Sequence, residues 1–222
     1  SEVINEMSPY WNELYGNASS KQNRSGIQAA AAVSLARDKI SSFLGVNSER
    51  VVFTSGATEA NNLGLLGTAR ARLYKGLGPG HIITISTEHL AVLDPLRQLK
   101  REGFRLTELN PTCDGLISID QVLDAFEDDT FLVSIMTANN EIGVLQPIEK
   151  IADLCRSNGV IFHTDAAQAF GHIPLDIGNI GLDLVSLSSH KLYGPKGIGA
   201  LIINKEVPII PLQWGGGQEY GL

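Results

Sequence analysis

Short apolar runs alternate along this chain with longer segments whose apolar residues recur at helical spacing. The runs that predict strands lie at 51–54, 81–86, 104–109, 131–136, 160–165, 182–189 and 198–204. Most of them lack a strict apolar–polar alternation, which is typical of strands covered on both faces of a sheet. Because helical segments separate them, the sheet is predicted to be mostly parallel. The pattern predicts an α/β fold of three layers, with a mostly parallel sheet between two layers of helices.

The segments predicted to be helical lie at 25–45, 58–74, 89–103, 118–126 and 147–159. The first of them carries an apolar stripe at helical spacing, formed by Val33, Ala36, Ile40 and Phe43. Pro95 is expected near the start of its helix, where proline is tolerated. Ser118 and Gln121 have the spacing of a capping box. The apolar segment 207–214 is expected to pack against a second subunit or a further domain.

Composition and charge exclude several classes of protein. The chain has 222 residues, enough for one sizeable core, and a single domain is expected. The formal net charge is −7, and an acidic chain without a basic stripe argues against a nucleic-acid partner. No apolar run approaches the roughly 18 residues of a transmembrane helix, and residues 1–17 lack the pattern of a signal peptide. We expect a cytoplasmic protein with no membrane partner.

The two cysteines predict neither a disulfide framework nor a metal site, because no CxxC motif or Cys/His cluster accompanies them. Cys155 follows Ile151 and Ala152 by one helical turn, so it is expected to be a buried thiol. Cys113 lies in the turn NPTCDG and is expected to be exposed. No histidine or basic residue lies near Cys113 in the sequence to activate it.

Polar residues follow several of the predicted strands. After 51–54 comes SGATEANN, a glycine turn that opens a helix. Free N–H groups at a helix start bind anions, and Ser55 and Thr58 add hydroxyl groups. An ordinary helix cap explains this turn equally well. His89 follows the second strand, where a structural histidine is the commoner case.

Further polar residues follow the later strands. Asn139 and Asn140 shape a turn or donate a hydrogen bond to a ligand. Asp165 ends an apolar strand, where an unpaired carboxylate is costly, so it requires a cationic or N–H partner. Lys191 follows the next strand, together with Ser188, Ser189 and His190.

In a parallel sheet these residues converge on one edge, where ligands bind. A lysine forms a Schiff base, a carboxylate holds a pyridinium N–H group, and a helix start holds a phosphate. These are the requirements of pyridoxal 5′-phosphate (PLP). The set therefore predicts a PLP site without a metal.

Five motifs in this order resemble those of the cysteine desulfurases, which are fold-type-I, class-V aminotransferase-like PLP enzymes. They are SGATEANN, TEH, NNEIG, HTDAAQAFG and SSHKLYGPKGIGAL. The resemblance extends from residue 15 to residue 222. It implies that residues 1–222 are the PLP-binding large domain, and that the family's N-terminal segment and small C-terminal domain are absent from this sequence.

The resemblance also implies a role for each residue. Lys191 forms the Schiff base and moves protons, and Asp165 pairs with the pyridine nitrogen. His89 stacks on the ring and assists proton transfer, so Lys191 and His89 are the implied catalytic residues. Gln168 and Asn140 approach the phenolic oxygen or the substrate. The phosphate is held by Ala57, Thr58, Ser188 and His190.

The implied reaction removes sulfur from L-cysteine, leaving L-alanine and a persulfide on an enzyme cysteine. The sulfur then passes to acceptor proteins such as an iron–sulfur scaffold, and the enzyme is expected to be a homodimer. The family's nucleophilic cysteine lies in the small domain, so this chain alone is expected to lack efficient activity. Neither Cys113 nor Cys155 is expected to replace that nucleophile.

Other functions are weighed against this one. Selenocysteine lyases and cystine C–S lyases share these motifs and are the nearest alternative. A non-catalytic PLP-fold scaffold has no need of the Lys191–Asp165 pair. A nucleotide-binding module ranks last, because the chain lacks a G-x-G-x-x-G motif and a Walker lysine.

Overall fold

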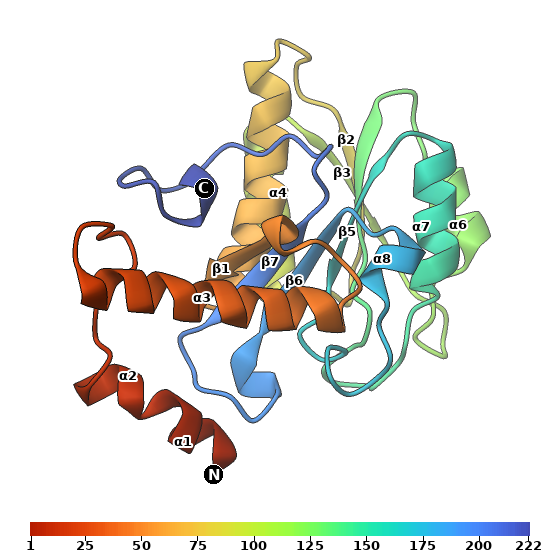
Figure 1. Ribbon diagram of the computed structural model, residues 1–222. Coiled ribbons are helices and arrows are strands. Elements are labelled where there is room, and N and C mark those ends of the chain that lie inside the picture. The colour runs from red at the N-terminus through yellow and green to blue at the C-terminus, as the bar shows by residue number, and fades with distance from the viewer.

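The computed structural model describes residues 1–222 and is built around one seven-stranded sheet (Figure 1). The strands are β1 (Val51–Thr54), β2 (His81–Ile85), β3 (Arg105–Leu109), β4 (Thr130–Ser134), β5 (Ile161–Asp165), β6 (Leu184–Ser188) and β7 (Gly199–Ile203). Their order across the sheet is β1-β7-β6-β5-β4-β2-β3. Only β7 runs antiparallel to its neighbours, β1 and β6. The mostly parallel sheet predicted from the sequence is confirmed.

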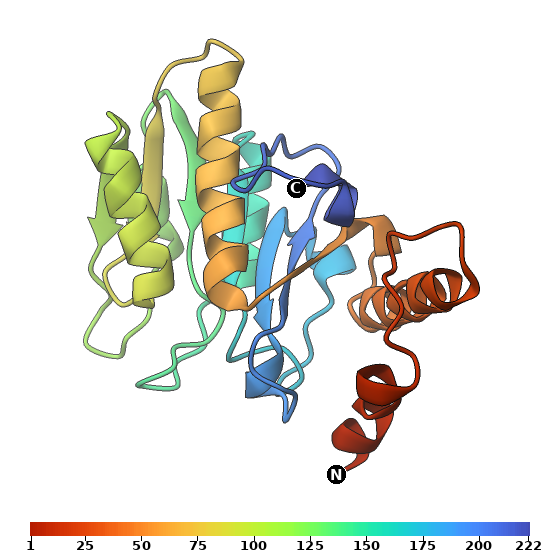
Figure 2. The same cartoon turned by 90° about the vertical axis from the view of Figure 1, so that its left-hand side faces the viewer.

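Helices cover both faces of this sheet. The α-helices of the chain are α1 (Glu2–Met7), α2 (Pro9–Asn12), α3 (Arg24–Phe43), α4 (Ala57–Tyr74), α5 (Leu90–Arg101), α6 (Ile119–Asp124), α7 (Ile148–Ser157) and α8 (Ile177–Ile180). Of these, α1 and α2 have no buried residue and lie apart from the sheet in Figure 1. Short 3₁₀ turns lie at Ser48–Arg50, Ser189–Lys191 and Gln218–Gly221. One buried cluster joins α4 and α5 to the sheet, and a larger cluster joins α6, α7 and α8 to the other face (Figure 2). The expected three layers are present, and no helix combines the length and apolarity needed to cross a membrane.

Consecutive strand residues explain why the sheet is buried on both faces. Side chains of a strand point alternately to opposite faces. Ile82 packs into the cluster with α4 and α5, whereas Ile83 packs into the cluster with α6 and α7. Leu132 and Val133 divide in the same way. Apolar residues at successive positions are therefore what a sheet between two helical layers requires.

A polar chain crosses the centre of the sheet. The Oγ atom of Ser134 lies 2.8 Å from Nδ1 of His163, and Nε2 of His163 lies 3.2 Å from Oγ of Ser186. Both ring nitrogens of His163 thus have a partner on a neighbouring strand. Complete burial lowers the pKa of His163 to about 3, so the ring is neutral at physiological pH.

Two local predictions for the helices had different outcomes. The capping box is confirmed: Gln121 N donates to Ser118 Oγ at 3.1 Å, and Ser118 N donates to Gln121 Oε1 at 3.0 Å. The predicted place of Pro95 was wrong, because this residue lies inside α5 and not near its start. Proline has no N–H group, so α5 lacks one internal hydrogen bond at this position.

The apolar stripe predicted on α3 does not face the core. Val33 and Phe43 are 38% and 64% exposed, Ala36 is exposed, and only Ile40 is half-buried. The buried residues of α3 are Gly26, Ala29 and Ser41. Figure 1 shows α3 crossing in front of β1, β7 and β6, and no other helix covers the side of α3 that faces the viewer. The spacing predicted the helix correctly, and the stripe that it carries is mostly exposed.

The segment 207–214 packs against its own chain. Val207 is buried, Ile209 and Leu212 contact the core clusters beside α4, and Ile210 N donates to Gly67 O at 3.3 Å. The expectation that this segment packs on a second subunit or a further domain was therefore wrong for most of it. Gly67 leaves the space on α4 that the segment fills. Trp214, in contrast, is 85% exposed.

Candidate active site

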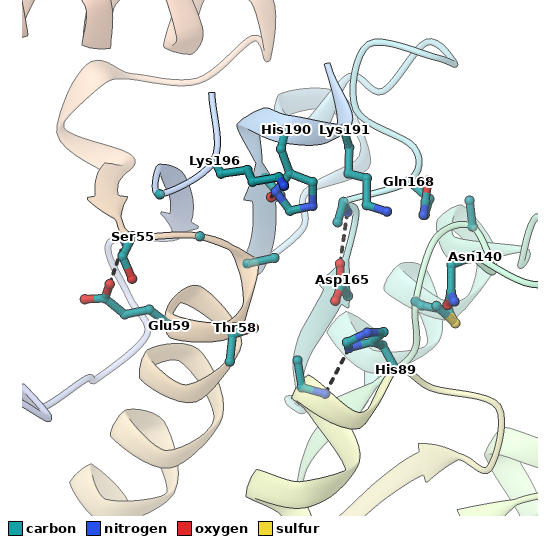
Figure 3. A pocket seen from close by; sticks show the side chains of 18 residues that line it. Ser55, Thr58, Glu59, His89, Asn140, Asp165, Gln168, His190, Lys191 and Lys196 are labelled. Atoms are coloured by element: carbon teal, nitrogen blue, oxygen red, sulfur yellow. Dashed lines mark hydrogen bonds between the residues drawn. The ribbon is translucent and has the colours of Figure 1, made fainter. Parts of the chain in front are cut away.

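A cavity of about 510 Å³ lies at the carboxyl edge of the sheet, which is the lower edge in Figure 1. Turns that follow β1, β2, β4, β5 and β6 form its wall. All nine residues predicted for the site lie on this wall, namely Ala57, Thr58, His89, Asn140, Asp165, Gln168, Ser188, His190 and Lys191 (Figure 3). The volume falls within the range of small-molecule sites. Parallel strands brought these distant segments to one place.

The turn before α4 presents a helix start to the cavity. Gly56 is the N-cap residue and supplies no side chain, so no cap hydrogen bond closes the first turn. Ser55 N donates to Glu59 Oε2 at 2.6 Å, which holds the turn that precedes the helix. The first N–H groups of an α-helix have no partner inside the helix. The wall therefore contains a helix start suited to an anion, with the hydroxyl group of Thr58 beside it.

Asp165 is the buried carboxylate of the site, with 6% of its surface exposed. Its Oδ1 accepts from Ala167 N at 2.9 Å, and its Oδ2 accepts from Asn61 Nδ2 at 2.8 Å. Burial raises the pKa of Asp165, while these two donors and the charges of His89 and Lys191 lower it. The partner that the sequence required is thus supplied by N–H groups of this chain.

Asn61 is a residue that the sequence reasoning missed. It lies on the buried face of α4, with no exposed surface, and its Oδ1 has no hydrogen-bond partner. The only available signal was the pair of asparagines at 61 and 62, next to the apolar run that begins at Leu63. That signal does not indicate that one of them contacts a strand residue 104 positions away.

His89 is the N-cap residue of α5. Its Nδ1 accepts from Ala91 N at 3.0 Å. When neutral, the ring therefore carries its proton on Nε2. Figure 3 places the His89 ring on one side of Asp165 and the Lys191 side chain on the other.

Lys191 ends the short 3₁₀ turn that follows β6 and is exposed to the cavity. Its backbone oxygen is 2.9 Å from His172 Nε2. Next to it, Ser188 Oγ lies 3.0 Å from His190 Nδ1. A second lysine, Lys196, lines the same wall and was not predicted. Ser188, His190, Lys191 and Lys196 form a polar part of the cavity wall that contains two lysine side chains.

The two asparagines after β4 have different surroundings. Asn139 is buried, its Nδ2 donates to Thr87 O at 2.9 Å, and its Oδ1 accepts from Glu141 N and Ile142 N. Asn140 is exposed and lines the cavity. The structure thus assigns the turn to Asn139 and places Asn140 where it can meet a ligand.

Neither cysteine lines the cavity. Cys155 is buried in α7, and burial raises its pKa to about 12, so the thiol stays protonated. Cys113 is exposed. The predicted surroundings of both thiols are confirmed.

The mostly parallel sheet, with a lysine and a buried carboxylate at its carboxyl edge, defines the large domain of a fold-type-I PLP enzyme. The family description Aminotransferase class-V matches residues 1–221, and the chain belongs to that family.

Relatives and solved structures agree with this assignment. The mitochondrial cysteine desulfurase of Drosophila melanogaster is 47% identical over 222 residues, which are 99% of this chain and 47% of that protein. The cysteine desulfurase IscS of Histophilus somni strain 2336 is 50% identical over 210 residues, 94% of this chain and 51% of that protein. The solved structure of SspA in complex with cysteine has a TM-score of 0.95 at 42% identity and covers 100% of this chain and 63% of SspA. The chain spans about half the length of the curated relatives it matches.

Proposed function

We propose that the protein carrying this chain is a PLP-dependent cysteine desulfurase, and that residues 1–222 form its PLP-binding large domain. It removes sulfur from L-cysteine and leaves L-alanine. One observation carries the proposal: Lys191 and the buried Asp165 line the same cavity as the uncapped start of α4. The names of the relatives favour L-cysteine over selenocysteine or cystine as substrate.

The residues present fit PLP. Asp165 is a buried carboxylate whose two oxygens accept only N–H groups, and it suits the protonated nitrogen of a pyridine ring. The start of α4, with Thr58, and the pair Ser188–His190 suit a phosphate. Lys191 supplies the amine for a Schiff base. When bound, PLP supplies the ring that withdraws electrons from the substrate α-carbon.

The side chains then have separate tasks. Asp165 would keep a proton on the pyridine nitrogen, because a negative charge in a buried site stabilises a cationic ring. His89 lines the cavity with its Nδ1 engaged in the α5 cap, and its imidazole would border the pyridine ring. Lys191 Nζ takes up and returns the substrate proton. Asn140 and Gln168 line the wall and orient the substrate.

We assign the sulfur-accepting nucleophile to a cysteine outside residues 1–222. Cys155 is buried, and neither thiol lies on the wall. The persulfide formed there passes sulfur to acceptor proteins such as an iron–sulfur scaffold. We propose a homodimer, and the exposed stripe of α3 supports it. The cytoplasmic location stays a prediction, because the relatives include a bacterial and a mitochondrial protein.

Covalent trapping tests the proposal. The protein is incubated with PLP, reduced with borohydride, digested and mapped by mass spectrometry. We expect the label on Lys191, its loss in Lys191→Ala, and its retention in the matched control Lys196→Ala, because both lysines line the cavity. A label that persists in Lys191→Ala contradicts the assignment. Formation of L-alanine from L-cysteine by the whole protein, compared with selenocysteine and cystine, tests the substrate.

A further inference from the structure

Glu88 is a buried acid beside the cavity that has no role in the function proposed above. It immediately precedes His89 in the turn between β2 and α5. Only 6% of its surface is exposed, and it does not line the cavity. A carboxyl group in such a place is costly unless it is hydrogen-bonded or neutral. The hydrogen bonds of Glu88 and its turn show which parts of the cavity wall they connect.

Two hydrogen bonds connect the turn of Glu88 to the segment after β4. Glu88 Oε1 accepts from Met136 N at 2.5 Å. In the second hydrogen bond the donor lies on the segment after β4: Asn139 Nδ2 donates to Thr87 O at 2.9 Å. The turn of Glu88 also carries His89, and the segment after β4 also carries Asn140. The carboxyl group of Glu88 therefore fixes two parts of the cavity wall relative to each other.

The surroundings of Glu88 favour its neutral form. Its Oε2 is buried and has no hydrogen-bond partner, and Asp165 on β5 is the charged group that acts on it. Asp165 has two N–H donors and the nearby charges of His89 and Lys191, whereas the only donor to Glu88 is Met136 N. Burial and the charge of Asp165 raise the pKa of Glu88 well above its ordinary value. Of the two buried acids, Asp165 is the one equipped to carry a charge.

We propose that Glu88 is a positioning residue that, as a neutral acid, holds the His89 turn against the Asn140 turn and leaves Asp165 as the buried negative charge of the site. The neutral state of Glu88 and its hydrogen bond to Met136 are properties of this chain and do not depend on the proposed function. The effect on cofactor and substrate rests on the proposed function. Separate measurements therefore test the two parts.

The protonation state is tested by infrared difference spectroscopy at pH 7 on the whole protein. We compare wild type with Glu88→Gln, and with Glu108→Gln as the matched control. Glu108 lies on β3, is half-buried and pairs with Arg97 at 3.3 Å, away from the cavity. The expected result is a C=O band of a protonated carboxylic acid that disappears in Glu88→Gln and persists in Glu108→Gln. Loss of carboxylate bands in Glu88→Gln overturns the proposal.

The positioning role is tested with three variants of Glu88. Glutamine keeps an acceptor oxygen within reach of Met136 N, whereas alanine removes it and aspartate is too short. We expect Glu88→Gln to retain PLP affinity and kcat/KM within about twofold, and Glu88→Ala and Glu88→Asp to lose about tenfold in kcat/KM, because displaced wall residues impair orientation. Equal losses in Glu88→Gln and Glu88→Asp overturn the positioning role.

These measurements distinguish a failure of the proposed function from a failure of the proposal about Glu88. If wild type does not bind PLP, the function proposed above is wrong, while the infrared bands still decide the state of Glu88. If Glu88→Ala does not fold, the comparison of Glu88→Gln with Glu88→Asp decides the positioning role.

Discussion

At the scale of single residues, Asp165 shows a conflict between stability and chemistry. Its carboxyl group is nearly out of contact with water, and burial raises its pKa although Ala167 N and Asn61 Nδ2 donate to it. A functional group held in this way costs stability that the rest of the fold must supply. Binding of a cationic ligand to the carboxylate would offset this loss of stability.

Replacement of Asp165 by asparagine is expected to stabilise the cofactor-free protein at pH 7. The folded-state pKa of Asp165 is raised above the ordinary value of 3.8, so its contribution to stability falls as pH rises through the folded-state pKa. Asparagine at position 165 does not ionise, so the variant removes this loss of stability. The side-chain amide of Asn61 can rotate so that its unpartnered Oδ1 accepts from the amide introduced at position 165. We expect a gain of about 1 kcal/mol, or roughly 2–4 °C in Tm.

Thermal melts of wild type and Asp165→Asn between pH 3 and pH 8 measure this effect. The difference in Tm should shrink as pH falls toward the ordinary aspartate pKa, where the unfolded chain also binds the proton. Borohydride trapping of PLP on Lys191 should weaken in the same variant. A wild type that is more stable than Asp165→Asn at pH 7 would disprove this account of Asp165.

At the scale of elements, α4 connects the site to the rest of the fold. Its start borders the cavity, its second turn carries Asn61 against Asp165, and Gly67 further along contacts the segment 207–214. Two glycines, Gly64 and Gly67, lower its intrinsic helix propensity by about 1 kcal/mol each relative to alanine. The atoms around Gly64 and Gly67 show that only one of the two positions lacks the space for a Cβ atom.

Alanine at these two positions is expected to have opposite effects. A Cβ atom on Gly67 would lie 2.9 Å from both Ile209 Cγ2 and Ile210 O, so Gly67→Ala must displace the segment 207–214. We expect it to lower the free energy of unfolding by about 1–3 kcal/mol. A Cβ atom on Gly64 would meet Leu201 Cδ1 at 3.4 Å, an ordinary contact. Gly64→Ala should be neutral or stabilise by up to about 1 kcal/mol. Urea unfolding measures both, and equal losses would contradict the packing argument.

At the scale of the whole molecule, one ion pair joins α3 to the C-terminal segment. Arg37 on α3 contacts Glu219 with two bonds, Nη1 to Oε2 at 2.9 Å and Nη2 to Oε1 at 2.8 Å. Phe53 N on β1 also donates to Glu219 Oε2, at 2.7 Å. The guanidinium group lies over the Phe53 and Tyr220 rings. One carboxylate thus holds α3, the edge strand β1 and the C-terminal segment together.

Removal of this carboxylate is expected to destabilise the fold. The side chains of Arg37 and Glu219 are only 11% and 22% exposed, so Glu219→Ala leaves a poorly solvated cation and an unpaired strand N–H group. We expect a loss of about 2 kcal/mol in the free energy of unfolding. Lys205→Ala, which breaks an exposed pair with Glu49, serves as the control and should cost less than about 1 kcal/mol. A double-mutant cycle of Arg37 and Glu219 measures their coupling, and a coupling near zero would refute the role of the pair.

The sequence by itself determined the fold class, the strands and nine residues of the cavity wall. Strands and helices follow from local periodicity, which depends on backbone geometry and not on partners. Once the sheet is parallel, residues that follow its strands must meet at one edge, which is why Lys191, Asp165 and His89 were found from widely separated motifs.

Only the tertiary structure decided which surfaces meet. The insertion of β7 between β1 and β6, the exposed stripe of α3 and the packing of 207–214 on α4 all depend on contacts between distant segments. Asn61 and Glu88 escaped the sequence analysis for the same reason. A polar residue in a helix or a turn is ordinarily solvated, and its burial against another strand end is set by long-range packing that no local pattern records.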